Sequence, residues 1–335
     1  MNLTADIQAS IVAKANRAPS VHNTQPSRWA FEDEGVQIYA DKSRFLDIGD
    51  PTLQDAGLSC GAALEGTVMA LADHDIHVSK VENFWDSETP GHYSDMRLAA
   101  KITMIKGAKP DPLSDFVGKR FTWRGSFEKA QDINPLLQWA KMQEDITLVS
   151  EPQSISQLAT LNDLASLKFF KNKAYRQELV AYMRLSKKHP LWDQDGLNRE
   201  SMHLSSFEGA AANILLRHPM FEIINAVGLG KTIVSEANKT TSATAIVFFT
   251  VPKETSPLDM GRSFYRRWLE ITALGYAVWP MAVIADDPDV NALCHKQYNI
   301  ASHHKIINVF RIGRVPQGTT IQAARLKNAE LILSD

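Results

Sequence analysis

The chain has 335 residues, of which 44% are hydrophobic and 22% are charged, and its formal net charge is −2. This length predicts two domains or one large duplicated unit, and the composition is that of a globular protein. The nearly balanced charge excludes a general attraction to nucleic acid or to an anionic membrane surface.

Cysteine usage and the first residues bear on the compartment. Cys60 and Cys294 are the only cysteines, which excludes a disulfide framework and favours a reducing environment. The residues after Met1 lack a basic start followed by an apolar stretch, so they do not resemble a signal peptide. We therefore expect a cytoplasmic protein.

The first predicted helix covers residues 5–16, where apolar residues recur at helical spacing. Residues 17–29 (Arg-Ala-Pro-Ser-Val-His-Asn-Thr-Gln-Pro-Ser-Arg-Trp) follow as a loop. Pro19 and Pro26 fix their own φ and favour extended backbone at the residues before them, which predicts a stiff loop. The hydroxyl and amide side chains of this loop suit the edge of a flat heteroaromatic ligand; alternatively, they bond to the backbone of the loop itself.

The rest of the first half contains two predicted strands and a buried helix between them. Residues 36–40 and 96–104 alternate between apolar and polar side chains, as strands do. Residues 58–71 form an apolar run rich in small side chains, which is typical of a helix that is buried on most sides. Residues 107–115 carry Gly and Pro and predict a boundary inside the chain.

The second half repeats this order of strand, helix and strand. The corresponding segments are residues 242–252, 261–276 and 305–313. Residues 61–76 align with residues 261–276 without a gap, so we expect an ancient duplication. Chance similarity between two amphipathic helices is the alternative.

Residues 150–240 have no counterpart in the first half. Their pattern predicts helices at 154–168, 175–185, 205–217 and 221–227. A structureless insertion of this length is rare, so we expect a helical arm that joins the halves and a cover over a ligand site. A helical side layer with no functional part is the alternative.

A basic motif lies at the start of the second half, in Lys119-Arg120-Phe121-Thr122-Trp123-Arg124. On extended backbone Arg120, Thr122 and Arg124 would point the same way, and two guanidiniums with a hydroxyl can bind a phosphate. A helix directly after the motif would add backbone N–H groups. A solvated charged face is the alternative.

Two motifs resemble one known family. The pattern Ala18-Pro-Ser-x-x-Asn-x-Gln-Pro26 resembles the flavin-ring loop of FMN-dependent nitroreductases, and its longer form from Arg17 is similar to their fused, two-repeat (Acg-like) branch. Arg120-x-Thr122-x-Arg124 is similar to the Arg-x-Ser/Thr-x-Arg signature that holds the FMN phosphate in this family. The resemblance implies the following cofactor-binding residues: Pro19, Ser20, Asn23, Gln25, Arg120, Thr122, Arg124 and Arg325. Arg314 is the rival of Arg325 for the C-terminal cation of the phosphate site.

The two motifs are distributed unequally between the halves. The first half contains the ring loop without the phosphate motif, and the second half contains the phosphate motif without the ring loop. In unfused members of the family each FMN lies across a dimer interface. The resemblance therefore implies an intrachain pseudo-dimer with one FMN site.

The resemblance also implies the fold class and the domains. We expect an α+β fold of two fused nitroreductase-like repeats, with mixed, mostly antiparallel sheets flanked by helices. The first repeat is expected at residues 1–112. The second is expected at residues 113–335, with a helical insertion or lid at about 165–240.

The expected function is that of an FMN-dependent oxidoreductase. NADH or NADPH would reduce the flavin at N5, and a nitroaromatic, quinone or similar acceptor would reoxidise it in a ping-pong reaction; no catalytic side chain is assigned. One alternative is a flavin-binding or flavin-storage protein whose lid occludes the site, and another is a cofactor-free relic. We expect small-molecule partners, no metal, no nucleic acid and no membrane, and either a monomer or a weak homodimer.

Overall fold

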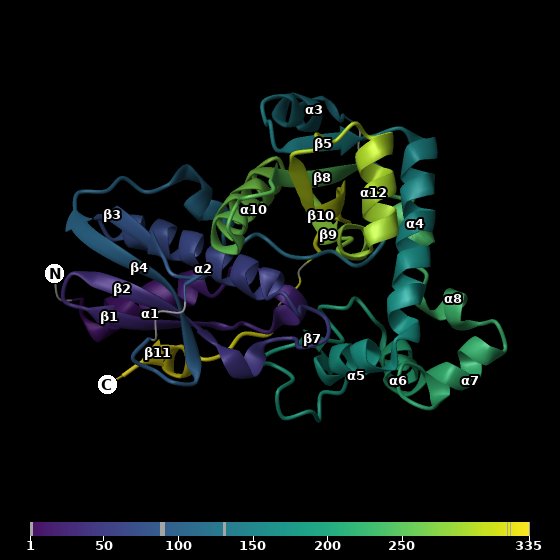
Figure 1. Cartoon of the computed structure of the whole chain (residues 1–335), viewed down its shortest axis with the longest axis horizontal. Helices are drawn as coiled ribbons and strands as arrows, with labels where there is room; N and C mark the ends of the chain where they lie inside the picture. The colour runs from purple at the N-terminus through teal and green to yellow at the C-terminus, as the bar shows by residue number, and fades with distance from the viewer. Residues whose placement is uncertain (1–2, 88–90, 130–131, 320, 322, 335) are drawn as a thin grey trace.

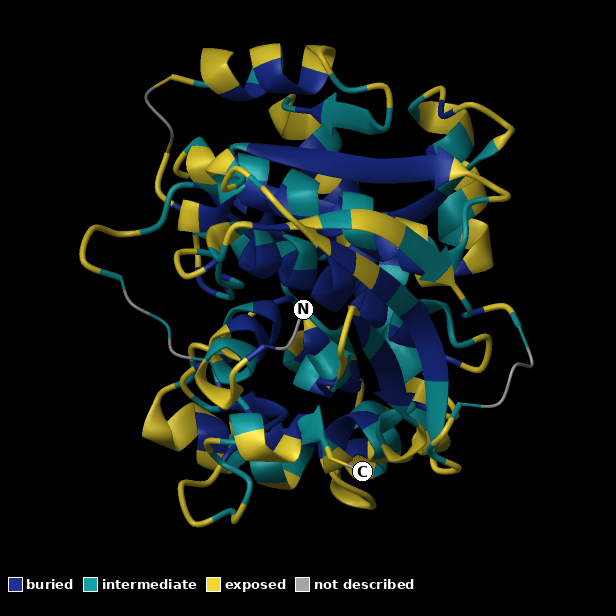
Figure 2. Ribbon diagram, turned by 90° about the vertical axis from the view of Figure 1, so that its left-hand side faces the viewer, coloured by how far each residue is buried: buried dark blue, intermediate teal, exposed yellow. Residues whose placement is uncertain are grey.

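The computed structural model describes residues 3–87, 91–129, 132–319, 321 and 323–334. Two β-sheets, each with its own long helix, form the body of the molecule, and the two helices pack against each other at its centre (Figure 1). A group of shorter helices extends from the second sheet. In Figure 2 the buried residues concentrate in the sheets and in the helices between them.

The first unit is built on a five-stranded sheet with the order β11-β1-β2-β4-β3, antiparallel except for the β1–β11 pair. Its strands are β1 (Ser27–Glu32), β2 (Gly35–Asp41), β3 (Ile76–Asn83), β4 (Met96–Lys106) and β11 (Ile332–Leu333). Helices α1 (Ala5–Ala15) and α2 (Gln54–Asp73) pack together on this sheet. Helix α2 is buried on nearly every side, which its small and apolar residues permit.

The second unit has an antiparallel sheet with the order β5-β8-β10-β9. Its strands are β5 (Ile146–Val149), β8 (Ala245–Pro252), β9 (Ala277–Pro280) and β10 (His304–Gly313). Its helices are α3 (Asn134–Lys141), α10 (Pro257–Ala273), α11 (Val283–Asp286) and α12 (Pro288–Gln297). Strand β8 is buried up to its last residue, so its continuous apolar run reflects a central position in the core.

The two units share one topology. The order β1-β2-β4-β3 in the first sheet corresponds to β5-β8-β10-β9 in the second, and in both the long helix connects the second strand to the third in the chain. Where α2 crosses α10, Gly61 faces Gly261. The predicted α+β fold of two repeats, with mostly antiparallel sheets, is confirmed.

Each unit sends a segment across to the other. After β4 the chain crosses to the second unit, where Thr122 forms a parallel bridge with Val278 of β9 and Glu128 pairs with Arg314. After β10 the chain returns, and β11 pairs with β1 of the first sheet, so that Trp29 lies opposite Ile332. The predicted candidate arginines lie on these two crossing segments.

The insert, residues 150–244, lies between β5 and β8, where the first unit joins β1 to β2 by two residues only. It contains α4 (Pro152–Lys171), α5 (Lys173–Ala181), α6 (Ser206–Leu215), α7 (Met220–Ala226), α8 (Gly230–Val234), α9 (Ala237–Thr240), β6 (Met183–Arg184) and β7 (Leu197–Asn198). Helices α5 to α8 surround a separate small core that includes Leu179 and Phe221. Among the described helices none is long and apolar enough to cross a lipid bilayer.

Candidate functional site

The loop between α1 and β1 has an unusual backbone. His22, Asn23 and Gln25 have φ values of 45°, 57° and 51°, in the left-handed region that non-glycine residues rarely adopt. The prediction that Pro26 keeps the preceding Gln25 extended is therefore wrong. Tertiary hydrogen bonds to the side chain of Gln25 hold it in this conformation, and such strain is concentrated at functional sites.

Gln25 is buried and bonded at both ends of its amide. Its Oε1 accepts from Asn16 Nδ2 at 3.0 Å and from the backbone N–H of Leu326 at 2.9 Å. Its Nε2 donates to the carbonyl of Gln194 at 2.8 Å. The backbone N–H of Gln25 also donates to Ser20 Oγ at 3.0 Å. In this structure Gln25 and Ser20 therefore support the loop itself, which starts with the partly buried Pro19.

Asn23 connects the loop to the C-terminal segment and to the insert. Its Nδ2 donates to the carbonyls of Ala324 and Gly196, at 3.0 and 3.1 Å. Its Oδ1 accepts from Arg325 Nη1 at 2.8 Å. The structure thus brings together a residue of the predicted ring loop and the predicted C-terminal cation, which are separated by some 300 positions in the sequence.

Arg120 and Arg325 converge on the same acceptor. Arg120 Nη2 donates to the carbonyl of Arg17 at 2.7 Å, and Arg325 Nη2 donates to the same carbonyl at 3.3 Å. The guanidinium of Arg120 also lies over the ring of Trp268, 4.5 Å from its centroid. Arg17, at the end of the first helix, adds a third positive charge to this group.

No described carboxylate forms a close ion pair with these cations. Within the described part of the chain, Arg17, Arg120, Arg124 and Arg325 form no ion pair within 4.0 Å, although several other arginines do. Burial lowers the pKa of Arg325 to about 9, with a further contribution from Arg120 and Arg17. Clustered cations without counter-charges form an attractive site for an anion.

Four buried polar atoms beside this cluster lack a close partner in the described structure. They are Nε of Arg120, Nε of Arg325, Nε1 of Trp268 and the hydroxyl of Tyr265, which interacts with nearby Arg120. Burial raises the pKa of the Tyr265 hydroxyl, and nearby Arg120 opposes this shift. Buried polar atoms are nearly always hydrogen-bonded in native proteins, so these donors fit a site that receives an acceptor from outside the chain.

Arg124 does not belong to this cluster and contacts the insert instead. Its Nη1 donates to the carbonyl of Ser201 at 2.8 Å, and burial lowers its pKa to about 10. Burial, with Arg124 as the second cause, lowers the pKa of His22 to about 4. The three residues of the predicted phosphate motif are therefore not grouped around one acceptor: Thr122, between the two arginines, is placed by its bridge to Val278.

The helix expected directly after this motif is absent. Thr122 bridges to Val278 of β9 and Glu128 bridges to Arg314, with no helix between them, and the next described helix is α3, which starts at Asn134. No helix N-terminus therefore follows the motif to add backbone N–H groups. Arg314, the rival of Arg325, stacks on Tyr276 at 3.9 Å and donates to the carbonyl of Gly275.

One segment of the insert, residues 193–203, includes β7 and contacts the ring loop and the C-terminal segment. The backbone N–H of Arg325 donates to the carbonyl of Asp193 at 3.1 Å, and the N–H of Gly196 donates to the carbonyl of Asn23 at 3.2 Å. The carboxylate of Asp195 binds Arg44 of the first unit at 3.1 Å and Arg184 of the insert at 2.9 Å. We call residues 193–203 the covering loop.

Sequence reasoning did not assign a role to Arg17, His22, Tyr265 or the covering loop. Arg17 and His22 belong to the motif that resembles the flavin-ring loop, so the sequence did indicate that they lie near the candidate site. Tyr265 is one apolar residue among many on α10, and only its unpaired hydroxyl distinguishes it. The described residues contain no group of three or more His, Cys, Asp or Glu side chains arranged to hold a metal ion.

Comparison with known proteins was made by sequence and by structure. No model of a protein family matches the chain. Over 105 residues the chain is 38% identical to a Mycobacterium tuberculosis protein named "Putative NAD(P)H nitroreductase acg", and the match covers 31% of each chain. A second M. tuberculosis protein, also named as an NAD(P)H nitroreductase, is 38% identical over 68 residues, or 20% of each chain. The chain thus matches about a third or less of the length of these curated relatives.

Two solved structures illustrate the structural comparison. A nitroreductase with bound FMN from Bacteroides fragilis has 13% sequence identity and a TM-score of 0.40, covering 67% of this chain and 100% of that one. An FMN-dependent nitroreductase from Mycobacterium smegmatis, solved with NADPH, has 13% identity and a TM-score of 0.37, covering 66% and 96%. The sequence match to the curated relatives confirms the resemblance to the nitroreductase family.

Proposed function

We propose that this chain is an FMN-dependent oxidoreductase that takes reducing equivalents from NADH or NADPH and passes them to a small acceptor such as a nitroaromatic or a quinone. The observation that carries the proposal is the cluster of Arg17, Arg120 and Arg325, which has no carboxylate partner in the described structure and lies against the loop that resembles a flavin-ring loop. The names of the curated relatives support the same class of reaction.

The residues of this cluster fit the phosphate of FMN. A phosphate monoester carries close to two negative charges at neutral pH and offers three acceptor oxygens. Arg120 and Arg325 each have a buried Nε without a partner, and the hydroxyl of Tyr265 lies beside them, next to Arg120. Hydrogen bonds from guanidinium to phosphate are charge-assisted and are stronger than neutral ones.

When bound, FMN would supply the redox chemistry, because its ring accepts and releases a hydride equivalent. The residues of the chain would bind and orient it. Arg124 keeps a positive charge near His22 at neutral pH, since its pKa remains near 10. The imidazole of His22, with a pKa of about 4, is neutral at the same pH. A fixed positive charge next to the ring loop would favour a negatively charged, reduced ring.

A second function is favoured by the covering loop. The carbonyls of Asp193, Gln194 and Gly196 accept hydrogen bonds from Arg325, Gln25 and Asn23. A loop tied this closely to the ring loop would restrict the approach of a second substrate. The second candidate is therefore a flavin-binding or flavin-storage protein that exchanges hydride slowly.

A spectroscopic experiment separates these functions. The purified chain, loaded with FMN, is mixed anaerobically with NADH or NADPH, and bleaching of the flavin band is followed before and after addition of a nitroaromatic or a quinone. Bleaching followed by reoxidation supports the oxidoreductase. Stable yellow protein that NADH and NADPH do not bleach supports storage. Failure to bind added FMN would overturn both.

A further inference from the structure

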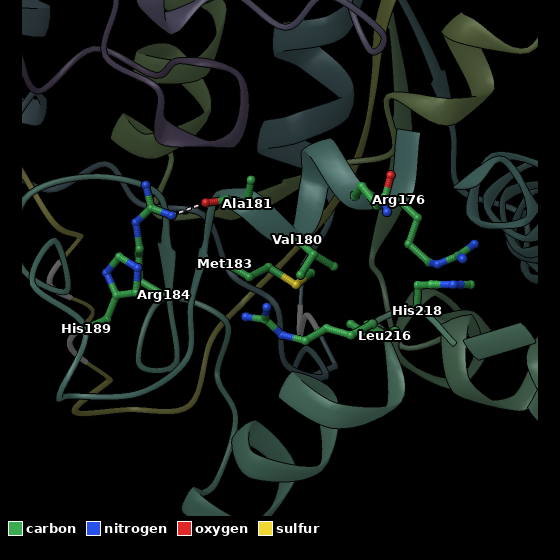
Figure 3. Close-up of a pocket in the computed structure, with 10 residues that line it drawn as sticks. Arg176, Val180, Ala181, Met183, Arg184, His189, Leu216 and His218 are labelled. Carbon is green, nitrogen blue, oxygen red and sulfur yellow. Dashed lines mark hydrogen bonds between the residues drawn. The ribbon is translucent and has the colours of Figure 1, made fainter. Parts of the chain in front are cut away.

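A basic pocket lies within the insert, and none of its lining residues belongs to the Arg17–Arg120–Arg325 cluster. It has a volume of about 470 Å³, and its walls come from α5, β6 and the segment between α6 and α7 (Figure 3). Figure 3 shows Arg184 and His189 at one end of this pocket and Arg176 and His218 at the other, with Met183 between them. Nothing in the proposed function uses these residues.

The lining of the pocket is strongly asymmetric in charge. Its residues include three arginines and two histidines, and no acidic side chain is among them. Two of the arginines have carboxylate partners: Arg176 binds Glu222, which also contacts His218, and Arg184 binds Asp195. The third, Arg217, bonds only to the side chain and carbonyl of Asn213, so its charge is not balanced by any described carboxylate.

The two neutralised arginines are fixed in place. Arg176 is 1% exposed, and its guanidinium also donates to the carbonyl of Phe170 and stacks on Phe221 at 4.6 Å. Arg184 is 7% exposed and also donates to the carbonyl of Ala181. Guanidiniums held in this way lose little side-chain entropy when they bind an anion. Arg176 additionally has a buried Nε without a partner.

The rest of the lining is apolar. Val180, Met183 and Leu216 contribute to the wall of the pocket between the basic ends. An inorganic anion would leave this surface unused, whereas an organic molecule with a charged group would contact it. The lining carries three guanidiniums, and guanidiniums form bidentate, charge-assisted hydrogen bonds with phosphate.

We propose that this pocket binds a phosphorylated small organic molecule, with its phosphate between Arg184 and Arg217 and its organic part against Met183 and Leu216. The site shares no lining residue with the Arg120–Arg325 cluster, and Arg184 connects the pocket to Asp195 of the covering loop. The proposal therefore does not depend on whether the chain binds FMN.

The test is isothermal titration calorimetry of the full chain with ADP, and with inorganic pyrophosphate as the probe without an organic part. We expect ADP to bind more tightly than pyrophosphate, and both to bind more weakly as the salt concentration rises. Arg217→Ala should weaken ADP binding at least about fivefold, because one charge-assisted contact is lost. Arg217 is exposed, so the variant is expected to fold, and a circular dichroism melt verifies this.

Two control variants decide where the probe binds. Lys171→Ala removes an exposed cation of the insert that does not line the pocket, and it should leave ADP binding unchanged. Arg120→Ala reports on any binding of the probe at the Arg120–Arg325 cluster. Loss of ADP binding in Arg120→Ala with full binding in Arg217→Ala would place the probe in the candidate flavin site and overturn the proposal. Absence of binding of both probes to the unmodified chain would overturn it as well.

Discussion

Gly61 and Gly261 face each other where α2 crosses α10. A Cβ atom on Gly61 would overlap the carbonyl oxygen of Leu258 and would come within 3.0 Å of the Cα of Gly261. A Cβ atom on Gly261 would overlap the carbonyl oxygen of Leu58 in the same manner. Each contact is thus repeated with the roles of the two helices exchanged, as in the self-complementary interface of a two-fold dimer.

This crossing makes the glycines sensitive to substitution. We expect Gly61→Ala to lower the free energy of unfolding by about 1–3 kcal/mol or more, because the added methyl group meets backbone and not a movable side chain. Urea denaturation followed by circular dichroism measures the change. Gly118→Ala is the matched control, since a Cβ there meets no atom within 4 Å. Equal stability of the two variants would contradict the close crossing.

The second prediction concerns the cation from the C-terminal segment. Arg325→Ala should weaken FMN binding about ten- to a hundredfold, because a charge-assisted hydrogen bond contributes about 1.5–3 kcal/mol. Flavin fluorescence on titration into the apoprotein measures the dissociation constant. Arg314→Ala serves as the control, because Arg314 bonds to Gly275 and stacks on Tyr276, away from the cluster. A larger loss in Arg314→Ala would assign the role to the rival residue.

The third prediction concerns stoichiometry. The connection between α1 and β1 carries the ring loop, whereas the equivalent connection between α3 and β5 spans only residues 142–145. We therefore expect about one FMN per chain, measured as flavin absorbance against protein mass. Two FMN per chain would show that the second unit builds a site without this loop.

The fourth prediction concerns pH. The pKa of His22 is about 4 in the folded chain, below the ordinary value of 6.5, so unfolding takes up a proton between these values. Its contribution to stability is complete above pH 6.5 and is lost as the pH falls toward 4. We expect a loss of about 2 kcal/mol between pH 7 and pH 5. His22→Asn, which tolerates the left-handed backbone, should reduce this pH dependence of the unfolding free energy, whereas His303→Asn at an exposed position should not.

The fifth prediction concerns the covering loop. Asp195 is 3% exposed and holds Arg44 and Arg184 together, so Asp195→Asn leaves Arg184 without its counter-charge and Arg44 with only its 3.6 Å pair to Asp41. Hydrogen exchange of the amides of residues 193–203 should become faster, because the loop opens more often. Glu200→Gln removes an exposed carboxylate of the same loop, paired only with exposed Lys187, and should change little. Unchanged exchange in Asp195→Asn would show that the loop is held by other contacts.

The sequence predicts the central helices and the buried strands with simple patterns, but it does not predict every strand. In β3 a bulge between Val78 and Lys80 interrupts the alternation of side chains, and so its pattern is weak. In β1, Arg28 is buried because it binds Asp41 at 2.8 Å, and a charged residue in a core strand hides the signal. The short β11 pairs with a strand about 300 positions away, for which no local pattern exists.

Only those parts of the candidate site that belong to a recognisable motif could be predicted from the sequence. Arg120, Arg325 and the loop around Asn23 were assigned by resemblance, and the structure places these three side by side. Tyr265 lies on α10 of the other unit, and Asp195 lies in the covering loop of the insert. Such relationships arise from tertiary packing and are not encoded in the spacing of neighbouring residues.

The place at which the insert joins the chain has a consequence for how this architecture can vary. Val149 and Ile246 are paired neighbours on β5 and β8, so the two ends of the inserted segment start from adjacent points of an intact hairpin. A shorter or longer accessory could be exchanged there, as loop tips generally tolerate, without altering either sheet or the cations that meet at Arg17. The covering segment and the cations of the candidate site can thus vary separately.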